Sequence, residues 1–129
     1  MAVARAAILH VEDDPSLQRL VRGGLEQLGG HIVRSAGSGA EALALAAQFA
    51  PQILLLDLDL PDMSGLALLK GLRGVAGYAA LPAVLLTAVR EPGARAQLDA
   101  LGVREVLQKP FRPRLLVEAI DRVVAKGGT

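Results

Sequence analysis

The chain has 129 residues, of which 52% are hydrophobic and 21% are charged, and it contains no cysteine. A domain of this length buries roughly two-thirds of the surface of its unfolded chain, so it needs neither disulfides nor a structural metal. The absence of cysteine excludes zinc–thiolate sites and cysteine nucleophiles, and 14 basic against 13 acidic side chains give no overall attraction to nucleic acid. We expect one domain over residues 1–129, with 126–129 as a tail or the start of a linker.

The apolar stretches of the sequence are too short to cross a bilayer, which takes about 20 residues, because charged residues or proline interrupt them. The start of the chain carries no visible export signal, since its first apolar run meets Glu12, Asp13 and Asp14. We therefore expect a cytoplasmic protein without a membrane partner.

Short apolar runs alternate with longer amphipathic stretches along the whole chain. The runs that we expect to form strands are residues 6–11, 32–33, 53–56, 83–86 and 106–107. Leucine, isoleucine and valine recur at helical spacing between and after these runs, most clearly over residues 17–28, 66–72 and 115–124. The resulting order is a strand followed by a helix, repeated along the chain.

The predicted helix ends agree with this order. Asp14 before Pro15 indicates an N-cap followed by proline in the first helical turn, and the glycine pair at 29–30 ends that helix. Ser38, with Glu41 three residues later, forms a capping box for the second helix. The connections are therefore short, and strands without polar alternation indicate a parallel α/β sheet covered on both faces. Ligands of such sheets bind beyond the carboxyl ends of the strands.

Polar side chains gather at that predicted edge. They are Glu12, Asp13, Asp57, Thr87 and Lys109. Carboxylates placed so close together repel one another unless a cation joins them, and an all-oxygen ligand set suits Mg²⁺ or Mn²⁺. Taken singly, each residue also fits an ordinary helix cap, strand end or loop, but those explanations do not account for all of them at the same edge.

Four motifs resemble those of the receiver domains of two-component response regulators, and together they span nearly the whole chain. They are HVEDD at 10–14, DLDLPDMSG at 57–65, LLTA at 85–88 and KPF at 109–111. The resemblance implies a flavodoxin-like (βα)5 fold, with a five-stranded parallel sheet in the order 2-1-3-4-5 between two layers of helices.

The resemblance also implies roles for individual residues. Asp57 would accept a phosphoryl group from a phosphohistidine of a sensor histidine kinase or phosphotransfer protein. Asp13 and Asp57 would ligate Mg²⁺, with Glu12 acting largely through water and the backbone carbonyl of Asp59 as a further ligand. Thr87 would hydrogen-bond a phosphoryl oxygen, and Lys109 would pair first with Asp57 and then with the phosphoryl group.

Two positions depart from the family pattern. Val106 stands where an aromatic residue usually acts as part of the switch with Thr87, so we expect signalling mainly through the loop at 89–93 and the helix after it. Asp59 adds a carboxylate beside the phosphoryl group, where it would change the phosphoryl lifetime unless it merely faces solvent.

Other residues lead to smaller expectations. We expect His10 to be a buried histidine whose ring nitrogens have hydrogen-bond partners, and His31 to be exposed. The family implies a cis peptide bond between Lys109 and Pro110.

The resemblance implies a phosphoacceptor signalling domain, which catalyses only its own phosphorylation and dephosphorylation. An alternative is a receiver-like module that binds proteins without being phosphorylated, although no acid, acceptor or lysine is missing. A remote alternative is a phosphatase similar to the haloacid dehalogenases, which share the Asp57-x-Asp59 pattern. That family needs a later acidic pair, and only Glu118 and Asp121 follow Lys109.

The expected partners are the phosphodonor protein, an output partner that the motifs do not identify, and no nucleic acid. A homodimer through the fourth helix, fifth strand and fifth helix is a further expectation. Leu98, Leu101, Val106 and Leu116 offer apolar atoms there, although core packing accounts for them equally well.

Overall fold

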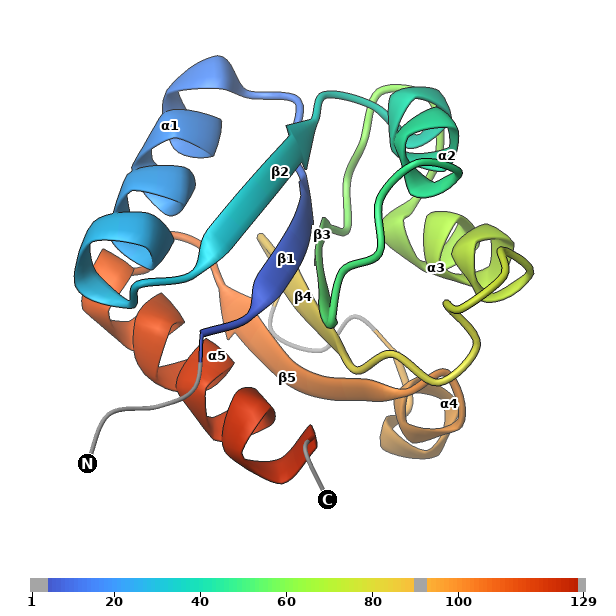
Figure 1. Ribbon diagram of the computed structural model, residues 1–129. Coiled ribbons are helices and arrows are strands. Elements are labelled where there is room, and N and C mark those ends of the chain that lie inside the picture. The colour runs from blue at the N-terminus through green and yellow to red at the C-terminus, as the bar shows by residue number, and fades with distance from the viewer. Residues whose placement is uncertain (1–4, 90–92, 128–129) are drawn as a thin grey trace.

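A computed structural model of the chain describes residues 5–89 and 93–127. Its strands form one parallel sheet in the order β2-β1-β3-β4-β5, which confirms the expected topology (Figure 1). The strands are β1 (Ala7–Val11), β2 (Ile32–Ala36), β3 (Ile53–Asp57), β4 (Ala83–Thr87) and β5 (Val103–Gln108). The fifth strand is longer than the predicted 106–107, because Arg104 and Glu105 separate Val103 from the apolar pair at 106–107.

Helices cover both faces of the sheet, with α1 and α5 on one side and α2, α3 and α4 on the other (Figure 1). Their bounds are α1 (Pro15–Gly23), the π-helical segment η1 (Gly24–Leu28), α2 (Gly39–Ala46), α3 (Gly65–Arg73), α4 (Arg95–Ala100) and α5 (Pro113–Gly127). The last helix thus includes Lys126 and Gly127, two of the four residues considered as a tail. None of the helices within the described residues is long and apolar enough to cross a membrane.

The first helical stretch, α1 continued by η1, begins and ends where the sequence indicates. Asp14 Oδ1 accepts hydrogen bonds from the N–H groups of Ser16 and Leu17, and Gly30, with a φ of 71°, follows the helix end. The sequence did not predict the π-helical segment η1. A Cβ atom at Gly24 would lie 3.1 Å from Cβ of Pro113, so glycine allows this segment to pack closely on the start of α5.

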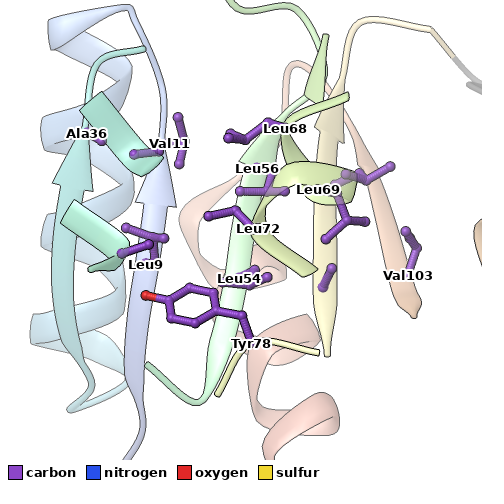
Figure 2. Close-up of a cluster of buried hydrophobic side chains, with 14 of the residues drawn as sticks. Leu9, Val11, Ala36, Leu54, Leu56, Leu68, Leu69, Leu72, Tyr78 and Val103 are labelled. Carbon is purple, nitrogen blue, oxygen red and sulfur yellow. The ribbon is translucent and has the colours of Figure 1, made fainter. Parts of the chain in front are cut away.

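Two hydrophobic clusters hold the helices to the sheet. Figure 2 shows the cluster beneath α3, where Leu54 and Leu56 of β3 face leucines of that helix. Burying one such leucine contributes roughly 1.5–3 kcal/mol, so these layers fix the position of the strand ends. Tyr78 closes one end of the cluster, and its hydroxyl donates a hydrogen bond of 2.6 Å to the carbonyl of Phe49.

The expectation that His31 is exposed is wrong, because only 3% of this residue is accessible. Its Nδ1 accepts the N–H of Ala6 at 3.0 Å, which leaves the proton on Nε2 to donate to Asp121 Oδ1 at 2.9 Å. The ring therefore joins the residue directly before β1 to α5. The sequence did not reveal this contact, because the partner in α5 lies 90 residues away along the chain.

His10 is buried as expected, but the expectation of hydrogen-bond partners is wrong. His10 lies on β1 and pairs in register with Ser35 of β2 and Leu55 of β3. Among the described residues, neither ring nitrogen of His10 has a partner, nor does Oγ of Ser35. Burial, with a smaller effect from the Lys109 charge, lowers the pKa of His10 to about 3, so the ring stays neutral.

Candidate functional site

The carboxyl ends of the strands bring the predicted polar residues to one edge of the sheet. Asp57 is the last residue of β3 and Thr87 the last of β4, while Glu12 follows β1. Lys109 follows β5, and its N–H donates to the carbonyl of Thr87 at 2.7 Å. The strand residues before them pair in parallel register, so these side chains lie close together although they are far apart along the sequence.

Three carboxylates form the centre of this site. One oxygen atom from each of Glu12, Asp13 and Asp57 lies within 4.8 Å of the others, which confirms that the predicted acids come together. Glu12 and Asp57 are buried, with 1% and 2% of each residue exposed, whereas Asp13 is exposed. This arrangement fits a small hard cation such as Mg²⁺, because it offers oxygen ligands on one side and access for water on the other.

Lys109 supplies positive charge to the two buried acids. Its Nζ lies 3.1 Å from Asp57 Oδ1 and 3.2 Å from Glu12 Oε1. Burial raises the pKa of Glu12 to about 7, and the charge of Asp57 raises it further. The hydrogen bond from the Asp14 N–H and the positive charge of Lys109 partly offset this rise. Burial also acts on Lys109, but its hydrogen bond to Asp57 and the two negative charges outweigh it and raise the pKa of the ammonium group.

Replacing Lys109 with Met is expected to lower the free energy of unfolding by about 2 kcal/mol at neutral pH in EDTA, because two buried carboxylates lose their cation. Urea denaturation measures the change. The matched control is Arg122→Met, which breaks a more exposed ion pair with Glu105 and should cost less than about 1 kcal/mol. Equal losses in the two variants would contradict the prediction.

The hydroxyl of Thr87 is hydrogen-bonded to the loop that follows β4. Thr87 is fully buried, and its Oγ1 accepts the N–H of Val89 at 3.1 Å. A movement of this side chain would therefore act directly on the start of the loop at 89–93. Residues 90–92 of that loop lie outside the described residues.

Val106 is half-buried and packs against the hydrophobic cluster on the α2, α3 and α4 face. The neighbouring Lys109–Pro110 peptide bond is cis, as the family resemblance implied. No aromatic side chain stands at position 106, so the usual aromatic partner of Thr87 is missing from this position.

The backbone of the loop between β3 and α3 packs closely against Asp57. The Asp59 N–H donates to Asp57 Oδ1 at 3.2 Å, and the Gly65 N–H donates to the carbonyl of Leu58 at 2.6 Å. A Cβ atom at Gly65 would lie 2.5 Å from the carbonyl oxygen of Asp57, so a side chain at this position would displace the backbone of the acceptor. The side chain of Asp59 is exposed. The sequence motif identified this loop. It did not reveal that Asp62 holds the tip of the loop.

An apolar groove of about 540 Å³ lies beside the site, between α1 and the segment 109–111 that leads into α5. It is lined by Asp14, Ser16, Leu17, Leu20, Lys109, Pro110 and Phe111. Leu20 is 48% exposed, which is high for a leucine. The sequence does not reveal this groove, because its two sides are far apart along the chain.

The sequence pattern of the response regulator receiver domain matches residues 8–121. The chain belongs to the receiver domain family of response regulators. The receiver domain is 32% identical over 123 residues to a chemotaxis protein CheY homolog of Campylobacter jejuni, covering 93% of each chain. It is 36% identical over 104 residues to the transcriptional regulatory protein KdpE of Mycobacterium tuberculosis, covering 81% of this chain. It spans 44% of the KdpE length, so it matches about half of that regulator.

Solved structures agree with this assignment. The receiver domain superposes on the chemotaxis response regulator CheY4 of Vibrio cholerae with a TM-score of 0.83 and 31% identity, covering 93% of this chain and 99% of that one. It also resembles the receiver domain of sensor histidine kinase PA1611 from Pseudomonas aeruginosa, with a TM-score of 0.81 and 28% identity, covering 95% and 100% of the chains. That structure has a magnesium ion coordinated in its active site cleft.

Proposed function

We propose that this receiver domain takes a phosphoryl group on Asp57 from a phosphohistidine, in a reaction that depends on Mg²⁺. The observation that carries the proposal is the position of Asp57 Oδ1, which lies 3.1 Å from Lys109 Nζ and beside the oxygens of Glu12 and Asp13. Such a carboxylate combines a nucleophilic oxygen with compensation for the charge of an incoming phosphoryl group.

In the proposed reaction, an oxygen of Asp57 forms a bond to phosphorus while the phosphorus–nitrogen bond of the donor breaks. The leaving imidazole keeps the electron pair of that bond. Asp13, Asp57 and the backbone carbonyl of Asp59 would hold Mg²⁺, with Glu12 acting largely through water. When bound, the ion would neutralise charge on the phosphoryl oxygens. Lys109 would pair with the phosphoryl group after transfer, and Thr87 would donate its hydroxyl proton to a phosphoryl oxygen.

The proposed donor is a sensor histidine kinase or a phosphotransfer protein that presents its histidine beside Lys109. The apolar groove between α1 and the segment 109–111 supports this docking site, since Leu17, Leu20 and Phe111 border the same opening as Lys109. A helix of the donor with an apolar stripe would cover the exposed face of Leu20. We propose that this phosphotransfer takes place in the cytoplasm.

The proposed signal runs from Thr87 to the loop at 89–93 and to α4. Phosphorylation adds about −1.5 to −2 charge, which attracts the Thr87 hydroxyl and pulls on its hydrogen bond to Val89. Since position 106 carries valine, we infer that this loop and α4 transmit more of the change than β5 does. The output partner would bind there.

A homodimer through α4, β5 and α5 remains a second proposal, but it does not rest on the leucines suggested by the sequence. Leu98 and Leu116 are buried in the core, with 3% and 0% of their surfaces exposed. The outer surface instead carries charged groups, including the ion pairs Arg95–Asp99 and Arg122–Glu105. A dimer here would therefore rely on polar contacts.

The haloacid dehalogenase-like alternative loses support, because its motif would begin on β3 and the later acids lie in α5. Asp121 there accepts a hydrogen bond from His31 on the opposite side of the fold from Asp57. A binding module that is not phosphorylated would be expected to lack an acid, the phosphoacceptor or the lysine of the site, and this chain has all of them.

The test is to incubate the purified chain with acetyl phosphate or phosphoramidate, with and without Mg²⁺, and to follow the intact mass. We expect one phosphoryl adduct that appears with Mg²⁺ and is absent in EDTA. An adduct that forms equally in EDTA would contradict the metal-dependent reaction. Hydrolysis of a phosphate monoester over many turnovers would favour the phosphatase, because a receiver that is repeatedly phosphorylated and dephosphorylated also releases phosphate from acetyl phosphate.

A further inference from the structure

The loop between β3 and α3, residues 58–64, is held at two separate places. At its base, Leu58 and Gly65 are joined by a backbone hydrogen bond of 2.6 Å, and Asp59 and Ser64 form an isolated bridge. The base lies directly beside Asp57. The tip of the loop is held elsewhere, by a helix that takes no part in the charged site.

That second attachment is made by Asp62. Its Oδ1 accepts the N–H of Gly39 and its Oδ2 accepts the N–H of Ala40, both at 2.9 Å. The side chain thus binds the first turn of α2 with both oxygens. The two N–H donors lower the pKa of Asp62, so the group is ionised at neutral pH.

The residue after Asp62 adds a packing contact to the same place. A Cβ atom at Gly39 would lie 2.5 Å from Sδ of Met63 and 2.7 Å from two of its carbon atoms. The thioether side chain therefore occupies the space that glycine leaves open at the start of α2. Loop 58–64 and α2 meet through this contact and the paired hydrogen bonds.

Capping of α2 alone does not explain these bonds, because the helix has its own N-cap. Ser38 Oγ accepts the N–H of Glu41 at 3.1 Å, and Glu41 Oε2 accepts the N–H of Gly37 at 2.9 Å. Asp62 reaches the helix from more than 20 residues away in the chain and binds two N–H groups that this capping box does not use.

We propose that Asp62 is a positioning residue of the phosphoacceptor site, holding loop 58–64 so that Asp59 presents its backbone carbonyl to the metal. The proposal rests on the proposed function above. Asp59 belongs to the base of the loop, through its bridge with Ser64, and its N–H bonds to Asp57 Oδ1 at 3.2 Å. With the tip released, the hydrogen bonds at the base of the loop would open more often, and Asp59 would sample several positions.

The first test uses the metal-free chain and measures amide hydrogen exchange by NMR in the parent, in Asp62→Ala and in Ser38→Ala. In Asp62→Ala we expect exchange to rise about tenfold at Asp59 and Gly65 as well as at Gly39 and Ala40. The matched control Ser38→Ala removes the cap of the same helix without touching the loop, so exchange should rise at Glu41 and stay unchanged at Asp59. Unchanged exchange at Asp59 and Gly65 in Asp62→Ala would overturn the proposal.

The second test measures Mg²⁺ binding by calorimetry and the lifetime of the phosphoryl adduct by intact mass. We expect Asp62→Ala to weaken Mg²⁺ binding about tenfold, with Asp62→Asn in between because its amide keeps one acceptor oxygen. Parent-like Mg²⁺ affinity in Asp62→Ala would also overturn the proposal, even if the loop exchanges faster. A parent chain that binds Mg²⁺ but never forms the adduct would instead contradict the proposed function and leave this result standing.

Discussion

Replacing Asp57 with Asn is expected to abolish the phosphoryl adduct while the chain remains folded. The amide oxygen of Asn carries no negative charge and is a poor nucleophile, so no bond to phosphorus forms. It still accepts a hydrogen bond, so the contact with the Asp59 N–H can persist. Removing one of three clustered charges also reduces repulsion at this edge of the sheet. Intact mass after incubation with acetyl phosphate and Mg²⁺ measures the loss.

The matched control for this experiment is Asp59→Asn, which removes an acid two residues away. Asp59 is exposed, and the role proposed for it in metal binding uses its backbone carbonyl, so this variant should still form the adduct, with a changed lifetime. An adduct of the same mass and yield on Asp57→Asn would show that another residue accepts the phosphoryl group. A variant unfolded by circular dichroism would call for Asp57→Glu in its place, which should also fail to form a parent-like adduct.

Replacing His10 with Leu is expected to stabilise the chain, and to do so more strongly in acid. At pH 7.5 the gain should be about 1 to 3 kcal/mol, because the substitution removes two buried ring nitrogens without partners. The pKa of His10 is about 3 in the folded chain and near 6.5 when unfolded. Between these values the unfolded chain binds the additional proton, so parent stability falls as the pH falls below 6.5. At pH 5 this adds about 2 kcal/mol to the gain.

Urea denaturation at pH 7.5, 6 and 5 in EDTA checks this prediction. The matched control is Ser35→Ala, which removes the remaining buried polar side-chain atom without a partner among the described residues, Oγ of the β2 residue that pairs with His10. Serine does not titrate in this range, so any gain in that variant should be the same at all three pH values. A difference between parent and His10→Leu that stays constant with pH would show that His10 is protonated to the same extent in both states.

The sequence by itself determined the order of the strands and helices and the composition of the site. Apolar runs such as 53–56 need only local information, since a strand buried on both faces has few polar positions. The cap at Asp14 and the acid, threonine and lysine motifs are equally local, and parallel strands carry their ends to one edge. For that reason the sequence alone predicts that Glu12, Asp13, Asp57 and Lys109 form one site.

The tertiary structure decided which side chains meet when their partners are distant along the chain. The burial of His31 depends on Asp121 of α5, and the missing partners of His10 depend on what β2 and β3 place beside it. The hydrogen bonds of Asp62 likewise join loop 58–64 to the first turn of α2, which no short motif connects. Each of these contacts is set by how the layers pack on the sheet, and periodicity along one segment carries no information about the segment that will cover it.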